Sequence, residues 1–258
     1  MKEGTAPSAI YRKDYTAYPW DVTRLELNFD IGIETTVVRA EMEFRSKNGD
    51  AGNLILNGSD LDLLAIELYG RPLAADDYVI EGETLTIPNA AQHSVLKTEV
   101  QIHPGKNSAL EGLYLSGDFL LTQCEAEGFR KITWFPDRPD VMTSYRVTLA
   151  ADKTTFPVLL SNGNQVGSGD LPDGRHWVCW QDPFPKPSYL FALVAGDLAL
   201  VEDHFRTRSG RDVSLRIYVE KENLDRCGHA MQSLVNEMRW DEDRFGLEYD
   251  LDFYHIVA

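Results

Sequence analysis

Apolar and polar residues alternate along most of the chain between residues 20 and 197. The clearest runs are Leu25, Leu27 and Phe29; Val38, Ala40, Met42 and Phe44; Leu64, Ile66 and Leu68; and Tyr145, Val147 and Leu149. Alternation with a period of two predicts β-strands that are buried on one face. Clusters of Gly, Asn and Asp separate the runs, so the pattern predicts a mainly β, antiparallel, sandwich-like or barrel-like domain through about residue 197.

Three local features refine this picture. The segment Val158–Asn164 reads as a strand that enters an Asn162-Gly163 turn, with Arg175–Trp180 as the returning strand, because Asn-Gly tolerates positive φ. The apolar run Tyr189–Ala195 predicts a strand that is covered on both faces. Residues 1–20 show no periodicity and are expected to be irregular.

The pattern changes after residue 197. A strand is predicted around Leu215–Val219, and Asn223 is a suitable N-cap for a helix that ends near Phe245-Gly246. The helix has apolar residues at Cys227, Met231, Leu234, Val235 and Met238. Leu251–Val257 reads as a buried strand. A β-α-β element of this size cannot bury both its faces alone, so we expect a first domain over residues 1–197 and the start of an α/β domain over residues 198–258.

Charge and composition exclude some classes of function. The formal net charge of −16 disfavours a nucleic-acid partner, which requires a basic surface. The sequence contains no run of about 18 apolar residues, so it predicts no membrane-spanning helix. The polar start Met1–Thr5 lacks an apolar leader, and three widely spaced cysteines indicate reduced thiols, so we expect a cytoplasmic location.

Candidate chemistry concentrates in the segment Gln123–Arg130. If this segment is extended, the side chains of Gln123, Glu125 and Glu127 point to the same side. Their amide and carboxylate oxygens suit a small cation, such as the α-ammonium group of a peptide. The residue types alone also allow a simple surface ion pair between Glu127 and Arg130.

The sequence offers no reaction machinery beside this segment. It contains no His-Glu-x-x-His motif, and none of its six histidines has a second histidine at i+4. A catalytic zinc site usually needs three protein ligands. We therefore expect no catalytic residue and no metal ligand in this chain.

Several motifs together resemble one enzyme family. They are Gln123–Arg130, Phe135–Val141, Leu160–Asn164, Gly174–Trp177, Asp182–Pro187 and Ala192–Asp197. Their order and spacing resemble those of bacterial-type zinc aminopeptidase N, of the gluzincin aminopeptidases, from about residue 10 to the last residue. The resemblance implies a saddle-shaped β domain, followed by the start of a thermolysin-like catalytic domain.

The resemblance also implies a function. Family members remove single amino acids from peptide N-termini, and by analogy Glu125 binds the substrate α-ammonium group while Gln123 lines the same pocket. The zinc ligands and the general base of the family follow a Gly-Ala-Met-Glu-Asn stretch that this sequence does not contain. We therefore expect zinc only in a full-length parent, the catalytic and C-terminal domains of that parent as partners, and an inactive isolated chain. The alternative is a non-catalytic β-rich module that binds peptides or sugars.

Overall fold

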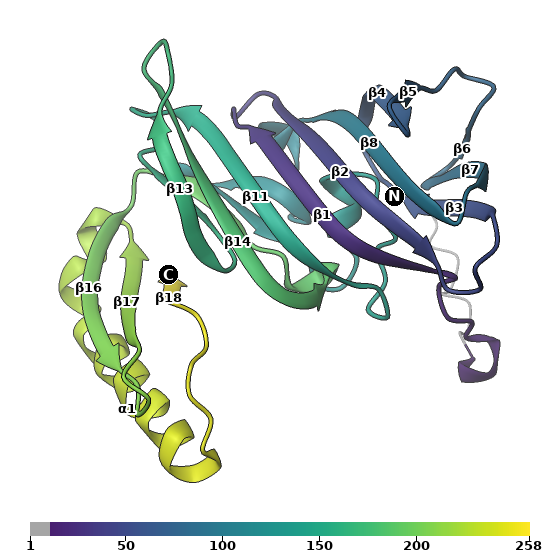
Figure 1. Cartoon of the computed structure of the whole chain (residues 1–258). Helices are drawn as coiled ribbons and strands as arrows, with labels where there is room; N and C mark the ends of the chain where they lie inside the picture. The colour runs from purple at the N-terminus through teal and green to yellow at the C-terminus, as the bar shows by residue number, and fades with distance from the viewer. Residues whose placement is uncertain (1–10) are drawn as a thin grey trace.

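The computed structural model describes residues 11–258, and these residues are mainly β-structure (Figure 1). They form eighteen strands in four sheets, one α-helix and several short 3₁₀ helices. The expectation of an irregular start holds for residues 11–19, which contain only the 3₁₀ helix Arg12–Asp14; residues 1–10 lie outside the described part.

An eight-stranded sheet dominates the upper part of Figure 1. In spatial order its strands are β13 (Asn164–Asp170), β14 (Arg175–Pro187), β11 (Met142–Asp152), β1 (Trp20–Asp30), β2 (Thr36–Ser46), β8 (His93–Ile102), β4 (Asp62–Leu68) and β5 (Arg71–Pro72). The predicted alternation is confirmed in β1, where Leu25, Leu27 and Phe29 are all at most 2% exposed, but it is wrong in part in β4, where Ile66 is buried and Leu64 is 52% exposed. The buried residues belong to a core that extends to Trp20 and Trp180.

The prediction of a wholly antiparallel arrangement is wrong at one pair. Strands β1 and β11 run parallel, with Leu25 opposite Tyr145 and Phe29 opposite Leu149. Parallel neighbours need a long crossover connection. Here more than one hundred residues separate the two strands, so the chain can re-enter the sheet in the same direction.

Two smaller sheets complete this part of the chain. One has the order β12 (Val158–Ser161), β15 (Leu193–Gly196), β10 (Phe119–Gln123) and β9 (Gly112–Ser116). The other has the order β3 (Gly52–Asn57), β7 (Thr84–Ala90) and β6 (Val79–Glu81). The apolar run at Tyr189–Ala195 is only partly a strand, because a 3₁₀ helix occupies Ser188–Leu190 before β15 begins.

The predicted hairpin at Asn162-Gly163 is wrong. Strand β12 pairs with β15, whereas the returning strand β14 pairs with β13 and β11. Gly163 has a φ of 91°, and a Cβ at this position would lie 2.2 Å from the carbonyl oxygen of Gln181. The Asn-Gly pair therefore bends the chain from one sheet into another instead of closing a hairpin.

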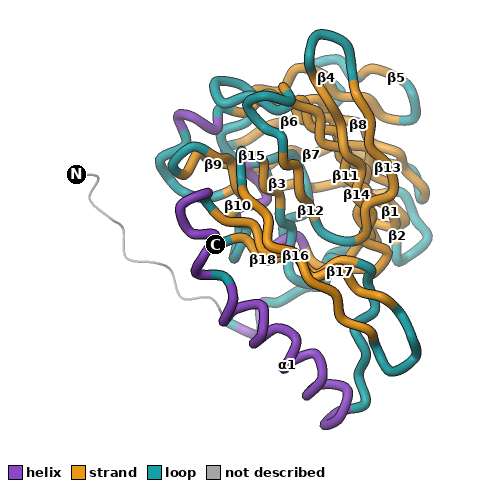
Figure 2. Tube along the Cα trace, turned by 90° about the vertical axis from the view of Figure 1, so that its left-hand side faces the viewer, coloured by secondary structure: helices purple, strands orange, loops and turns teal. Residues whose placement is uncertain are grey.

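The C-terminal residues form a separate small sheet and the helix, at the lower left of Figure 1. The sheet has the order β16 (Ala199–Arg206), β17 (Asp212–Val219) and β18 (Phe253–Val257), with β17 and β18 parallel. Helix α1 (Gly228–Phe245) packs on it and lies at the outer edge of the molecule (Figure 2). No helix within residues 11–258 combines the length and the apolar character needed to cross a membrane.

The predicted helix end is confirmed and its predicted start is wrong. Gly246 follows α1 in the left-handed conformation, with a φ of 67°. The helix begins at Gly228, after a 3₁₀ helix over Lys221–Arg226. Asn223 does not cap it, because Asn223 lies within this 3₁₀ helix and Cys227 occupies the N-cap position.

Strand β18 lies between the two hydrophobic cores, because Phe253 packs against the core of the large sheet and Ile256 packs against the core of the C-terminal unit. The ring of Trp180 on β14 packs edge-on against Phe253 and His255 of β18, with centroid distances of 6.1 and 5.2 Å. The side chain of Asn164 accepts a hydrogen bond from the backbone N–H of Asp252 at 2.7 Å. Strand β18 is thereby fixed to the edge of the large sheet.

Candidate functional site

The Gln123–Arg130 segment is a turn and not an extended strand. Strand β10 ends at Gln123, and the N–H of Gly128 then donates a hydrogen bond to the carbonyl oxygen of Cys124 at 2.9 Å. A 3₁₀ helix follows at Phe129–Lys131. The expectation that three side chains alternate onto one side is therefore wrong, because the chain must reverse here to enter this helix.

The turn nevertheless brings the two predicted binding residues together. Both Gln123 and Glu125 are exposed. The side-chain amide of Gln123 donates from Nε2 to the carbonyl oxygen of Glu125 at 3.2 Å. This contact fixes the two residues relative to each other at the end of β10.

The two carboxylates of the turn differ in their partners. Glu127 forms the ion pair with Arg130 that the residue types allowed, with 3.3 Å between Oε1 and Nη2. Within residues 11–258, Glu125 has no cationic side chain within 4 Å. Glu125 is thus the carboxylate of the turn that is free to take an external cation.

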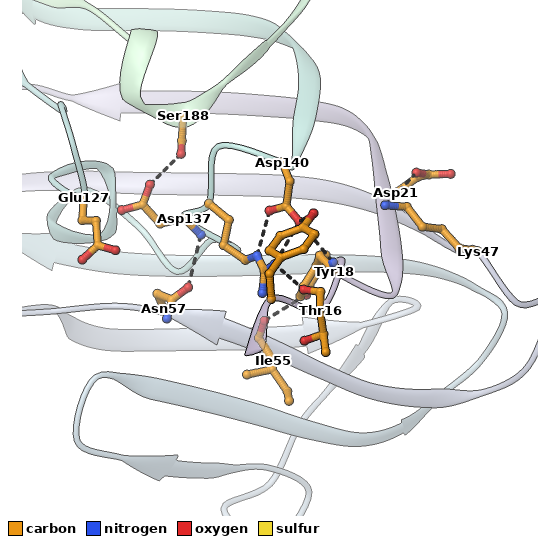
Figure 3. Close-up of polar contacts among 12 residues, drawn as sticks. Thr16, Tyr18, Asp21, Lys47, Ile55, Asn57, Glu127, Asp137, Asp140 and Ser188 are labelled. Atoms are coloured by element: carbon orange, nitrogen blue, oxygen red, sulfur yellow. Dashed lines mark hydrogen bonds and ion pairs between the residues drawn. The ribbon is translucent and has the colours of Figure 1, made fainter. Parts of the chain in front are cut away.

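A buried polar network lies beneath the exposed surface of the turn. Its central residue is Asp137, which was not predicted as a site residue. The side chain of Asp137 is 1% exposed. Its Oδ2 accepts hydrogen bonds from the backbone N and from Nε of Arg130 at 3.1 and 3.2 Å. Its Oδ1 accepts from Ser188 at 2.5 Å, and its backbone N–H donates to Asn57 at 3.2 Å (Figure 3).

The surroundings of this network are strongly desolvated. Burial raises the pKa of the Cys124 thiol well above its ordinary value, and the nearby Asp137 adds to the effect. Burial also raises the pKa of Tyr145. Among the described residues its hydroxyl has no hydrogen-bond partner. The Cys124 side chain is therefore a protonated packing group and not a nucleophile.

A second buried pair lies beside Tyr145. Lys186 donates to Asp182 at 2.9 Å, and its ammonium group sits 3.9 Å from the centre of the Tyr145 ring. Burial lowers the pKa of Lys186, and the contact with Asp182 partly offsets the decrease. Both residues of the pair lie on β14, and the contact of Lys186 with the ring of Tyr145 joins the end of this strand to β11.

Two cavities flank the turn and β15. One of about 430 Å³ is lined by Tyr18, Asn57, Glu127, Arg130 and Arg138. The other, of about 240 Å³, separates β15 from β18 and is lined by Leu193, Asp182 and His255. Neither Gln123 nor Glu125 lines these two cavities, because both side chains point out from the surface turn.

The described residues do not build a metal centre. Within residues 11–258, no three side chains of His, Cys, Asp or Glu come together as ligands for one ion. The residues present therefore do not fit a catalytic zinc ion, and no step through zinc is assigned to them.

Comparison with known proteins identifies the family. The Peptidase M1 N-terminal domain family matches residues 13–190. Aminopeptidase N of Escherichia coli is 52% identical over 252 residues, and aminopeptidase N of Haemophilus influenzae is 50% identical over 253 residues. These alignments cover 98% and 97% of the chain, which spans only about 29% of the length of each relative.

Solved structures agree with this result. The crystal structure of Legionella pneumophila aminopeptidase A in complex with aspartic acid superposes with a TM-score of 0.89 and 32% identity, covering 95% of this chain and 29% of that one. An M1 zinc metallopeptidase from Deinococcus radiodurans shares the fold, with a TM-score of 0.76, 13% identity, and coverage of 93% and 56%. The resemblance to aminopeptidase N is confirmed, and the chain belongs to the M1 peptidase family, whose N-terminal domain it contains.

Proposed function

We propose that this chain supplies the α-amine recognition of a zinc aminopeptidase that removes single amino acids from peptide N-termini. The observation that carries the proposal is the contrast between the two carboxylates of the turn. Glu127 is neutralised by Arg130, while Glu125 is exposed and has no ion-pair partner among the described residues. An exposed, unpaired carboxylate on a fixed turn suits a cationic group that arrives with the substrate.

The chemistry of the two residues fits a primary ammonium group. The carboxylate of Glu125 accepts a charge-assisted hydrogen bond, which is stronger than a neutral one. Because Nε2 of Gln123 is engaged by the Glu125 carbonyl, its Oε1 is the atom left to accept a second N–H from the ammonium group. An internal peptide bond has no such cation, so the site favours exopeptidase cleavage.

The remaining parts of the proposal concern organisation. Residues 1–197 correspond to a saddle-shaped β domain, and residues 198–258 to the start of a thermolysin-like catalytic domain. The parallel β17–α1–β18 unit and its own core support this division. We place the zinc ligands and the general base in the part of the relatives that does not align with this chain. The chain alone should therefore hydrolyse no peptide. A cytoplasmic location is part of the same proposal.

A chimera tests the proposal with this chain. The matching N-terminal segment of Escherichia coli aminopeptidase N is replaced by residues 1–258, and kcat/KM is measured on an alanyl anilide. We expect Glu125→Gln to lower kcat/KM about 10- to 100-fold, as for the loss of a hydrogen bond to a charged group. The zinc content of the chimera should be unchanged, because Glu125 does not belong to any cluster of possible metal ligands among the described residues.

Glu111→Gln is the matched control. Glu111 is also exposed and precedes Gly112, which packs against the turn, so its substitution makes the same change of charge nearby. We expect it to leave kcat/KM within about twofold, because the one ion pair of Glu111 within residues 11–258, to Lys131 at 4.0 Å, is exposed at its carboxylate, and such pairs contribute little. Equal losses in both variants, or loss of zinc in Glu125→Gln, would refute the role of Glu125.

A further inference from the structure

We propose that Asp137 is a positioning residue for the amine site: through Arg130 it holds Glu127 in its ion pair and leaves Glu125 free. This inference rests on the proposed function and concerns the same turn. Asp137 does not touch the exposed face of the turn, since its side chain is 1% exposed.

The first step of the argument is the geometry of Arg130. Its backbone N and its Nε donate to the same oxygen of Asp137, so one buried carboxylate fixes both the 3₁₀ helix and the side chain. The side chain is 15% exposed, and its Nη2 lies 3.3 Å from Glu127. Held in this way, the guanidinium group pairs with Glu127 and, at 3.8 Å, with Glu83, and not with Glu125.

The second step is the anchoring of Asp137 itself. Its other oxygen accepts from Ser188, in the 3₁₀ helix that precedes β15, and its backbone N–H donates to Asn57 at the end of β3. Figure 3 shows Ser188 and Asn57 on opposite sides of Asp137. The position of the turn is thereby set by two different sheets and not by the turn alone.

The third step is the consequence of removing the carboxylate. Asparagine at position 137 still offers one carbonyl oxygen to the two donors of Arg130, but it lacks the negative charge that helps to balance the guanidinium group. The guanidinium group then keeps Glu127 and, at 3.8 Å, Glu83 as acidic neighbours, but it loses the buried carboxylate that fixes its direction. The unpaired carboxylate of its own turn, to which it can then move, is Glu125. An Arg130–Glu125 pair would compete directly with the α-ammonium group of the substrate.

The test isolates amine recognition from catalysis. In the chimera we measure inhibition by an amino-acid hydroxamate and by the same hydroxamate without its amino group. We define the ratio as the inhibition constant of the compound without the amino group divided by that of the compound with it. This ratio reports the contribution of the amine, because the contributions of all other groups cancel. We expect Asp137→Asn to lower this ratio about tenfold, a size typical of coupling within one hydrogen-bonded network.

Asp140→Asn is the matched control. Asp140 lies on the same loop and is paired with Arg138 at 2.8 Å, but it holds the N-terminal segment through Tyr15 and Tyr18. Its loss should lower the melting temperature without changing the ratio. If Asp137→Asn and Asp140→Asn change the ratio equally, Asp137 has only a structural role and the inference is wrong.

Two further measurements keep the result decisive. Ser188→Ala removes one donor to Asp137 and should lower the ratio less than Asp137→Asn does. In the 258-residue chain, Asp137→Asn should accelerate hydrogen exchange of the Gly128 and Arg130 amides, and Asp140→Asn should not; unchanged exchange in Asp137→Asn refutes the inference. If Glu125→Gln fails to lower the ratio, the proposed function fails; if only Asp137→Asn fails to lower it, this inference alone fails.

Discussion

Gly128 is the residue of the turn that tolerates substitution least. Its backbone angles are φ −82° and ψ −16°, which any residue can adopt, so the requirement for glycine is one of space. A Cβ at this position would lie 2.3 Å from the carbonyl oxygen of Gln123 and 3.0 Å from the backbone N of Gly112. Both neighbours are backbone atoms of paired strands, so no side-chain rotation relieves the overlap.

Gly128→Ala should therefore destabilise the chain. Overpacking in a closely packed region costs about 1–3 kcal/mol, and we expect the upper half of this range because backbone must move. For a chain of this size, about 2–3 kcal/mol corresponds to a decrease in melting temperature of about 4–12 °C. The same shift displaces Glu125, so in the chimera the ratio of inhibition constants should also fall.

Thermal unfolding followed by circular dichroism measures the first effect. Gly228→Ala is the control, since a Cβ at Gly228 meets no atom within 4 Å and lies in the first turn of α1. It should leave the melting temperature unchanged or raise it slightly, because alanine favours helix. A Gly128→Ala variant that is as stable as the parent chain would show that the turn moves freely, and the argument for a fixed Glu125 would fail.

Two further predictions concern buried ionisable groups. Burial, and repulsion from Arg216, lower the pKa of His255 from its ordinary value of about 6.5 to about 4. Below pH 6.5 the unfolded chain therefore binds the proton more readily, and stability should fall by about 2 kcal/mol between pH 7 and pH 5. Urea unfolding at the two pH values should show a smaller decrease in His255→Leu, and an equal decrease would contradict the assignment. Lys186→Met and Asp182→Leu should each cost about 3–5 kcal/mol by leaving one buried charge unpaired. The double variant should cost less than either single change, and additive costs in urea unfolding would refute this.

The strands of the large sheet could be predicted because their signal is local. Each of β1, β2 and β11 has one buried face, and burial of alternate residues imposes a period of two on the sequence. The end of α1 was predictable for the same reason, since Gly246 adopts the left-handed conformation that favours glycine.

The errors arise where the decisive contact is distant in sequence. The parallel pairing of β1 with β11, and the change of sheet at Gly163, depend on which strands arrive next to each other after long connections. Nothing in the local pattern distinguishes a turn within one sheet from a bend between two. Asn223 illustrates a local competition, because a 3₁₀ helix over Lys221–Arg226 forms where the cap was predicted and moves the start of α1 to Gly228.

The candidate site was predictable only in part. Gln123 and Glu125 were singled out because a cluster of oxygen-bearing side chains is visible in the sequence, and the resemblance gave them roles. Asp137 lies in the family motif Phe135–Val141, but no role was predicted for it. Its function in the network depends on Ser188, which is 51 residues away in the chain, so no spacing rule could identify the pair.

Strand β15 lies between the Gln123–Arg130 turn and the C-terminal unit. The N–H of Leu193 donates to the hydroxyl of Thr122 at 2.8 Å, and Thr122 immediately precedes Gln123. Leu193 also lines the 240 Å³ cavity whose opposite wall includes His255 of β18. The strand that precedes the turn, β10, is therefore held within a sheet by its pairing with β15, and the cavity lies between β15 and β18. Sites supported by strands hold their geometry more closely than sites on loops, and an amine anchor must stand at a fixed distance from the bond to be cleaved, because a displacement of about 1 Å can cost 100-fold in rate. Under the proposed function, the pairing of β10 with β15 would keep the amine anchor at a fixed distance from the first peptide bond.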